Sequence, residues 1–124
     1  MKRGVSLKFI CYPKCSTCKK AQKWLDANDI SYEVRNIQAE RPDEKELALW
    51  QRQSGLPLRR FFNTSGLLYR SMDLARKLDC MAEDEQLRLL STDGLLVKRP
   101  LFVGQDFVLV GFKETEWAEK LLKD

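Results

Sequence analysis

The fold of this chain is decided by residues 12–20, which read Tyr-Pro-Lys-Cys-Ser-Thr-Cys-Lys-Lys. Upstream, residues 7–12 alternate in polarity and are rich in strand formers, which predicts a strand that the following proline ends. Downstream, apolar side chains recur on one face over residues 16–28, which predicts an amphipathic helix. The two cysteines of the stretch, Cys15 and Cys18, therefore lie where a strand passes into a helix.

This position suits a redox-active pair of thiols. At a helix N-terminus, unpaired backbone N–H groups and the helix dipole favour an anion, and Lys14, Lys19 and Lys20 add positive charge. Both effects favour the thiolate form of Cys15, which is the nucleophilic form. Because Cys18 lies about one helical turn further on, it can attack a mixed disulfide formed at Cys15. The motif therefore predicts thiol–disulfide chemistry with Cys15 as nucleophile and Cys18 as resolving thiol.

Other interpretations of the cysteines stay open at this point. A structural metal site needs more ligands, and the sequence offers only Cys11 and Cys80 besides the pair, with no histidine. The plainer alternative is that Cys15 and Cys18 are reduced core residues without a chemical role, because cysteine is often a small buried hydrophobe. On the same grounds we expect Cys11 to be a buried strand residue and Cys80 an unpaired surface thiol.

Length and composition narrow the possible functions. The chain has 124 residues, of which 44% are hydrophobic and 32% charged, which is typical of one globular domain over residues 1–124. Because histidine is absent, Ser-His-Asp triads, Cys-His protease pairs and HExxH zinc sites are excluded. The net charge of +4 is modest, so we expect no direct nucleic-acid partner. Since no signal or membrane segment is recognisable, we expect no membrane partner and a cytoplasmic, reducing location.

The remaining sequence predicts a mixed sheet flanked by helices, an α/β fold. Asp43 and Glu46 form a capping box that opens a helix, and Gly55 ends it. From there to about residue 92 the sequence lacks strand alternation and predicts short helices and loops. Four further segments have the pattern of strands or of an amphipathic helix: 30–37 (strand), 101–103 and 107–110 (hairpin) and 113–123 (helix).

A second motif, Lys98-Arg99-Pro100-Leu101, precedes the predicted hairpin. A proline at the first residue of a strand cannot donate to the ladder and can take the cis form. On the residues alone, an ordinary proline preceded by solvated charges is an equal alternative.

Four segments together resemble the ArsC/Spx family, a thioredoxin-fold group that includes glutaredoxin-coupled arsenate reductases and the Spx transcriptional regulators. They are residues 12–20, Phe-Phe-Asn-Thr-Ser-Gly at 61–66, Lys-Arg-Pro-Leu at 98–101 and Val-Gly-Phe at 110–112. The resemblance extends from about Leu7 to Leu122. It implies a thioredoxin/glutaredoxin-like mixed sheet flanked by helices, with an ArsC-type all-helical insertion at about residues 43–92.

The resemblance also implies roles for single residues. Cys15 matches the nucleophilic cysteine and Cys18 the second cysteine of the Spx-type CxxC. Pro100 matches a cis-proline that faces the nucleophile, and Arg99 the arginine beside it that binds an oxyanion. Asn63 stands where the arsenate reductases hold the oxyanion with a further arginine, and another such arginine falls near Gly111. Three lysines are candidates for compensating charge: Lys14, Lys19 and Lys98.

We therefore expect a thiol–disulfide oxidoreductase related to glutaredoxin-coupled arsenate reductases. Its catalytic residues would be Cys15 and Cys18. Its substrate-binding residues would be Lys14, Asn63, Arg99 and Pro100. Glutathione, glutaredoxin or thioredoxin would donate the electrons, and we expect no tightly bound cofactor and no metal. The alternative that the resemblance implies is an Spx-like, redox-switched regulator that binds the RNA polymerase α subunit.

Overall fold

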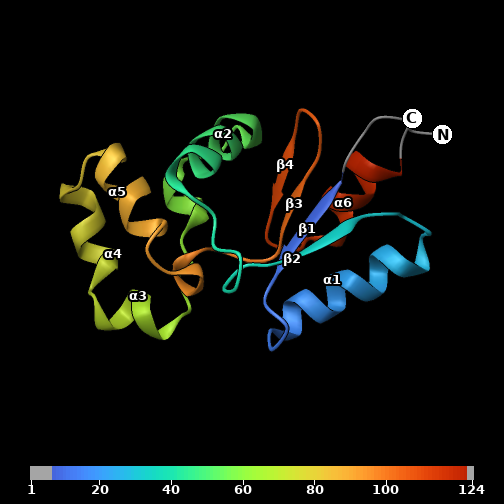
Figure 1. The fold of residues 1–124 in the computed structure, drawn as a ribbon, viewed down its shortest axis with the longest axis horizontal. Helices are drawn as coiled ribbons and strands as arrows, with labels where there is room; N and C mark the ends of the chain where they lie inside the picture. Colours follow the sequence, from blue (N-terminus) through green and yellow to red (C-terminus); the bar gives the residue numbers. More distant parts are fainter. Residues whose placement is uncertain (1–6, 123–124) are drawn as a thin grey trace.

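A four-stranded mixed sheet organises the chain, of which the computed structural model describes residues 7–122. Its strands, in the order β2-β1-β3-β4 (Figure 1), are β2 (Glu33–Asn36), β1 (Lys8–Cys11), β3 (Leu101–Val103) and β4 (Val108–Val110). β1 and β2 are parallel and are connected through α1 (Ser16–Ala27), whereas β3 runs antiparallel to both β1 and β4. Phe9 lies at the centre of the sheet, opposite Val34 in β2 and Phe102 in β3.

The two faces of the sheet are covered by different helices (Figure 1). Because side chains alternate along a strand, Phe9 and Phe102 point to one face, where they pack with α1 and α6 (Glu114–Leu121). Ile10 and Leu101 point to the opposite face, which is covered by α2 (Glu44–Ser54) and the short helices that follow it. The CxxC helix therefore shares a face of the sheet with the C-terminal helix and not with the helical insertion.

Aromatic side chains fill the face beneath α1 and α6. Trp117 of α6 is fully buried, and its ring centre lies 5.3 Å from that of Phe102 and 5.0 Å from that of Phe112. The indole N–H of Trp117 donates a hydrogen bond to the carbonyl of Gly111 at 3.0 Å. Full burial of a phenylalanine contributes about 1.5–3 kcal/mol to folding, so this cluster fixes both helices against the sheet.

The segment between β2 and β3 is helical, as the sequence predicts. The α2 helix opens with the predicted capping box, in which Asp43 accepts from the backbone of Glu46 at 2.8 Å and Glu46 accepts from the backbone of Asp43 at 3.1 Å. It ends at Gly55, whose φ of +71° is the left-handed conformation that favours glycine. The elements that follow are η1 (Leu58–Phe61), α3 (Leu67–Ser71), α4 (Leu74–Lys77), η2 (Leu78–Cys80), α5 (Glu83–Leu90) and η3 (Gly94–Leu96).

A short antiparallel bridge joins the start of this helical segment to its end. Phe62 pairs with Val97, the backbone N–H of Asn63 donates to Leu96 at 2.8 Å, and that of Lys98 donates to Phe61 at 2.8 Å. Residues about 35 positions apart in the sequence are thereby held side by side, just ahead of β3.

The fold class predicted from the sequence is confirmed, with small shifts in element boundaries. β2 begins at Glu33 and not at Ile30, because the backbone N–H of Ile30 bonds back to Leu25 and completes the end of α1. The last helix is described to Leu121, and the predicted end at Lys123 lies outside the described residues. Within residues 7–122, no helix has the length and apolar character that a membrane span requires.

Candidate active site

Cys15 is the residue that precedes the first turn of α1. Its extended backbone (φ −98°, ψ 122°) makes it the N-cap, and its own N–H donates to the Tyr12 carbonyl at 3.0 Å. No side chain caps the helix, and the first turn contains no acidic residue. The helix N-terminus is therefore free to stabilise an anion beside the half-buried Cys15 thiol.

Cys18 lies one turn further along α1 and is only 3% exposed. Its Sγ accepts a hydrogen bond from the backbone N–H of Tyr12 at 3.4 Å. The pKa of the Cys18 thiol is raised above its ordinary value by hydrogen bonding to the Cys11 thiol and by burial. Of the two cysteines of the motif, Cys15 is therefore the one that solvent and substrates reach, and Cys18 is held as a protonated thiol behind it.

A hollow of about 440 Å³ opens in front of Cys15. It is bounded by the first residues of α1, by the loop between η1 and α3, and by the segments on either side of the β3–β4 hairpin. All charged residues among the described residues that line it are cationic: Arg60, Lys98, Arg99 and Lys113. A thiol and a helix N-terminus thus face a concave surface of positive charge, which favours anionic ligands.

Arg99 is held in place from two sides. Its guanidinium carbon lies 5.2 Å from the centre of the Tyr12 ring, a cation–π contact. Its Nη1 donates to the Leu95 carbonyl at 3.3 Å. The peptide bond between Arg99 and Pro100 is cis, which agrees with the resemblance, and Pro100 is buried directly ahead of β3.

Asn63 enters the hollow from the bridged segment. It is 9% exposed, its backbone is fixed by the bond to Leu96, and its Oδ1 accepts a hydrogen bond from the Ser65 hydroxyl at 3.3 Å. Gly66 packs so closely against it that a Cβ at that position would lie 2.7 Å from Nδ2 of Asn63. A glycine is therefore needed at residue 66 for Asn63 to keep this position.

The structure brings some of the predicted site residues together and leaves others apart. Cys15, Asn63 and Arg99 all line the hollow, and so does Lys98. Cys18 lies behind Cys15, and Pro100 is buried beneath the surface of the hollow. The side chains of Lys14 and Lys19 are exposed and do not line it, because they project from the turn before α1 and from the outer side of that helix.

Two cations of the hollow were not among the residues predicted for the site. Arg60 lies in η1, which ends at Phe61, two residues before Asn63, and both Arg60 and Asn63 line the hollow. Lys113, the N-cap of α6, arrives from the opposite end of the chain. The signal for Arg60 was its place three residues before Asn63, about one turn of a 3₁₀ helix.

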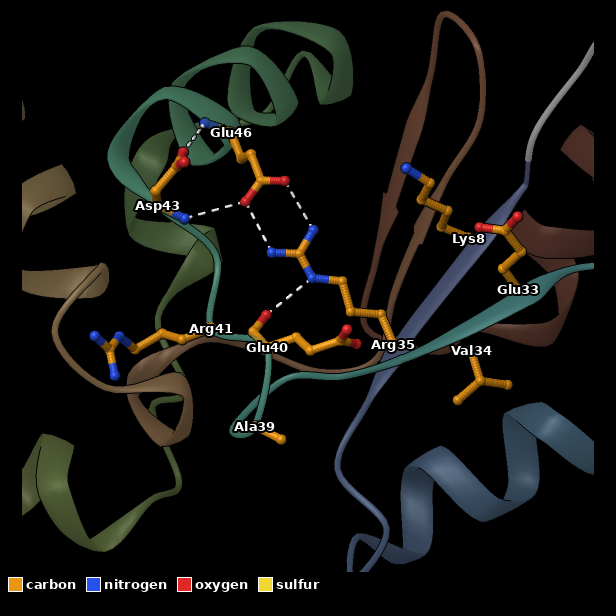
Figure 2. Close-up of a pocket in the computed structure, with 9 residues that line it drawn as sticks. All are labelled: Lys8, Glu33, Val34, Arg35, Ala39, Glu40, Arg41, Asp43 and Glu46. Carbon is orange, nitrogen blue, oxygen red and sulfur yellow. Dashed lines mark hydrogen bonds and ion pairs between the residues drawn. The ribbon is translucent and has the colours of Figure 1, made fainter.

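A second, larger hollow of about 670 Å³ lies at the β2 edge of the sheet, away from the cysteines (Figure 2). Its charged groups mostly satisfy one another. The guanidinium of Arg35 donates to both carboxylate oxygens of Glu46 at 2.8 Å and to the Glu40 carbonyl at 2.9 Å. This pairing raises the pKa of Arg35 and lowers that of Glu46. No cysteine, serine or threonine is among its lining residues, and we assign this hollow a structural role.

The residues that could hold a metal do not converge. Within residues 7–122, no group of three or more histidine, cysteine, aspartate or glutamate side chains forms a set of ligands. Cys80, at the end of η2, is exposed and free, as predicted for a surface thiol, and Cys11 is buried in β1.

Comparison with known proteins places this geometry in a family. The family model described as "ArsC family" matches residues 11–120. The protein YusI of Bacillus subtilis is 48% identical over 93% of this chain and 98% of its own length. The crystal structure of an ArsC family related protein from Bacteroides fragilis superposes with a TM-score of 0.90, at 52% identity, over 92% of this chain and 96% of that one.

Relatives whose names carry a function fall into two groups. A "possible arsenate reductase" from Streptococcus mutans has a TM-score of 0.82 and 40% identity, over 89% of this chain and 93% of that one. The regulatory protein MgsR of Bacillus subtilis is 26% identical over 89% of this chain and 86% of its own length, and global transcriptional regulators named Spx match at similar identity. The scaffold is therefore shared by proteins named as reductases and by proteins named as regulators.

Proposed function

This chain belongs to the ArsC family, and on that premise we propose that it is a thiol-dependent reductase of anionic disulfides, with Cys15 as nucleophile. One observation carries the proposal. The accessible thiol at the N-terminus of α1 faces a hollow whose charged lining residues are all cationic. The structure of the "possible arsenate reductase", at 40% identity, supports the same class of reaction.

The reaction we propose has two exchange steps. The Cys15 thiolate attacks one sulfur of the substrate disulfide, so that a mixed disulfide forms at Cys15 and the first substrate thiolate leaves. Cys18 then attacks the Sγ of Cys15, the second substrate thiolate leaves and takes the proton that Cys18 gives up, and a Cys15–Cys18 disulfide remains. Glutathione, glutaredoxin or thioredoxin returns two electrons to the pair and restores both thiols.

The raised pKa of Cys18 fits the order of these steps. Because Cys18 stays protonated behind Cys15, it does not compete for the substrate disulfide. The mixed disulfide at Cys15 brings a leaving thiolate that can accept the Cys18 proton. In a chain without histidine, the leaving group itself thus serves as the base for the resolving step.

The cations would hold the anionic end of the substrate. Glutathione disulfide carries carboxylates on both halves, and a guanidinium can bind a carboxylate through two parallel hydrogen bonds. Arg99 is already oriented by Tyr12 and Leu95, so little side-chain entropy is lost when it binds. Asn63, at the place of a family arginine, leaves fewer charges for a small oxyanion such as arsenate.

A turnover assay tests the proposal. Wild type, Cys15→Ser and Cys18→Ser are assayed with glutathione disulfide, a small neutral disulfide and arsenate, each with glutathione/glutaredoxin and with thioredoxin as reductant. We expect Cys15→Ser to fall to background, because the nucleophile is lost. Cys18→Ser should keep activity only with glutathione, which can replace the resolving thiol. Cys80→Ser is the matched control, since this exposed thiol lies outside the site. Wild-type turnover in Cys15→Ser would contradict the proposal that Cys15 is the nucleophile.

A second candidate function comes from the regulators. The similarity to MgsR and to the Spx proteins supports a redox-switched protein that binds the RNA polymerase α subunit, with the Cys15–Cys18 disulfide as the switch. A pull-down with the C-terminal domain of that subunit, under oxidising and reducing conditions, tests it. Retention that depends on the redox state and is lost in Cys18→Ser supports the regulator, whereas no retention in either state removes it.

A further inference from the structure

We propose that Cys11 is a third redox thiol, which converts the Cys15–Cys18 disulfide into a buried Cys11–Cys18 disulfide and frees Cys15. The inference rests on the proposed function in one respect, because turnover is what forms the Cys15–Cys18 disulfide. Cys11 itself belongs to neither the CxxC motif nor the second motif, and its sequence pattern predicted only a buried strand residue.

The fold places Cys11 and Cys18 against each other. Cys11 is the last residue of β1, and it points to the same face of the sheet as Phe9, the face that α1 covers. Cys18 projects from α1 into this same apolar cluster, and Cys15 packs against its margin. Cys11 and Cys18 are 7% and 3% exposed, so their contact is shielded from solvent thiols.

One hydrogen bond limits how far apart the two residues can be. The Sγ of Cys18 lies 3.4 Å from the backbone nitrogen of Tyr12, and that nitrogen is bonded to the carbonyl carbon of Cys11. With standard backbone lengths, the Cys18 Sγ is therefore no more than about 6 Å from the Cα of Cys11. Because a cysteine Sγ lies about 2.8 Å from its own Cα, a Cys11 side chain turned toward Cys18 leaves about 3 Å between the two sulfurs, so a disulfide bond of about 2 Å requires a further approach of about 1 Å.

The thiols interact in the reduced protein. The Cys18 thiol hydrogen bonds to the Cys11 thiol, and this bond outweighs burial and lowers the pKa of Cys11. Cys18 also hydrogen bonds to the thiol of Cys15, so it has one cysteine neighbour on either side. The central sulfur is thus the one that both Cys11 and Cys15 can bond.

The exchange balances without any added reagent. The Cys11 thiolate attacks the Sγ of Cys18, a Cys11–Cys18 bond forms, and the Cys15–Cys18 bond breaks. Cys15 leaves as a thiolate at the N-terminus of α1, where the helix dipole and the cationic hollow stabilise the negative charge. The proton that Cys11 gave up passes to solvent, and the protein remains oxidised by two electrons throughout.

After the exchange, the protein contains a buried Cys11–Cys18 disulfide and a free thiol at Cys15. The disulfide moves from the partly exposed position of Cys15 to a pair that is almost fully buried. Cys15 then faces the hollow as a free nucleophile and can attack a small anionic disulfide such as glutathione disulfide, so that a mixed disulfide forms at Cys15 and one glutathione thiolate leaves.

Tryptic mapping separates the two disulfides, because Lys8, Lys14 and Lys19 divide the three cysteines between two peptides. Cys11 falls in peptide 9–14, whereas Cys15 and Cys18 share peptide 15–19. The wild-type protein is oxidised with a small disulfide, quenched in acid, alkylated with N-ethylmaleimide at pH below 7 and digested. We expect peptides 9–14 and 15–19 to be joined, with the alkyl label on Cys15, in most oxidised chains.

The opposite result is that Cys11 takes no part in a disulfide. If oxidised chains contain only the closed loop within peptide 15–19, with Cys11 alkylated, the proposal is overturned. Cys80→Ser is the matched control, and it should give the same cross-link because Cys80 is distant and exposed. The mapping uses a chemical oxidant and no turnover, so a failure of the proposed reductase activity does not alter its outcome.

A redox titration gives a second measurement. If the Cys11–Cys18 form is favoured about tenfold, the oxidised state of wild type is stabilised by about tenfold relative to Cys11→Ala, which lowers the midpoint potential by about 30 mV. Cys11→Ser serves in place of Cys11→Ala if the alanine variant folds poorly. Equal midpoint potentials in wild type and in the folded variant contradict the proposal.

Discussion

The hollow at the β2 edge and the hollow in front of Cys15 are both lined by charged residues, but the first contains both signs of charge and the second only cations. At the β2 edge, Arg35 lies between the Glu46 carboxylate and the Glu40 carbonyl, so the central charges of this hollow are paired within the fold (Figure 2). In front of Cys15, Lys113 lies 4.0 Å from the Glu116 carboxylate, and the other three cations face the hollow without a carboxylate partner among the described residues. Across residues 7–122, no carboxylate forms an ion pair with Arg60, Lys98 or Arg99.

The comparison teaches that size and charge alone do not identify a functional site. The larger hollow lies where hydrogen bonds connect β2 to α2. The smaller hollow brings together charges of one sign, a helix N-terminus and a thiol. Charges that are already paired stabilise the fold, whereas unpaired charges of one sign attract a ligand of the other sign.

Among the substitutions that test this difference between the two hollows, removal of Arg99 should lower activity the most. We expect Arg99→Ala to lower kcat/KM for glutathione disulfide about a hundredfold, because an oriented charged donor is lost. Arg41→Ala, at the β2 edge, is the matched control, since Arg41 donates to the Ser91 carbonyl and touches no cysteine. It should stay within about twofold of wild type. Steady-state kinetics measure kcat/KM for both variants. Equal losses would contradict the claim that the two hollows differ in their part in substrate binding.

A methyl group at Gly66 should disturb the cationic hollow through Asn63. Because the added Cβ would lie 2.7 Å from Nδ2 of Asn63, we expect Gly66→Ala to reduce stability by about 1–3 kcal/mol and activity by about tenfold. Urea unfolding and turnover are measured together. Gly55→Ala is the control: its positive φ makes the change cost about 1 kcal/mol, but no atom lies within 4 Å and activity should not change. Full activity in Gly66→Ala would show that the position of Asn63 does not matter.

Loss of the Glu46 charge should weaken the fold and leave the chemistry intact. Glu46→Gln keeps an oxygen for the capping box but loses the ion pair with Arg35, so we expect about 1 kcal/mol less stability and unchanged turnover.

The pH dependence of that loss has a definite sign. Arg35 lowers the pKa of Glu46 below its ordinary value of 4.5, so the stabilisation is complete above pH 4.5 and disappears as the pH falls through the folded-state pKa. The difference in unfolding free energy between wild type and Glu46→Gln should thus be constant from pH 7 to about pH 5 and shrink in more acid solution. A difference that persists at pH 2 would rule out the ion pair as its source.

Salt should have the smallest effect. Between low salt and about 0.5 M, screening should raise the KM for glutathione disulfide about threefold, because the cations of the hollow are exposed to solvent. The KM for a small neutral disulfide should barely change. Equal salt effects on both substrates would mean that the cations do not contribute to binding.

Local chemistry made most of the fold predictable from the sequence. Asp43 and Glu46 signalled the start of α2, alternation signalled β1, and the CxxC stretch signalled the junction of β1 and α1. Each of these patterns depends on residues within a few positions of one another. The start of β2 did not follow as closely, because the backbone bond from Ile30 to Leu25 is not encoded in the pattern of side chains.

The site was less predictable because it is assembled from distant segments. Arg60 is 45 positions from Cys15, and Lys113 is 98 positions from it, yet both line the same hollow. The Phe62–Val97 bridge, with its flanking backbone hydrogen bonds, and the packing of α6 bring them there. Lys14 shows the converse, since nearness in sequence to Cys15 does not bring its side chain into the hollow.

The hydrogen bond from Trp117 to Gly111 gives the protein an internal optical probe. Trp117 is fully buried, its indole N–H is fixed to the Gly111 carbonyl, and its ring meets the edge of Phe112 at 5.0 Å. Gly111 and Phe112 both line the hollow in front of Cys15. A ligand bound there therefore contacts the two residues that surround the indole of Trp117. The emission of a variant that keeps Trp117 as its sole tryptophan, with Trp24 and Trp50 replaced by phenylalanine, should therefore report occupancy of the site in real time without any attached dye.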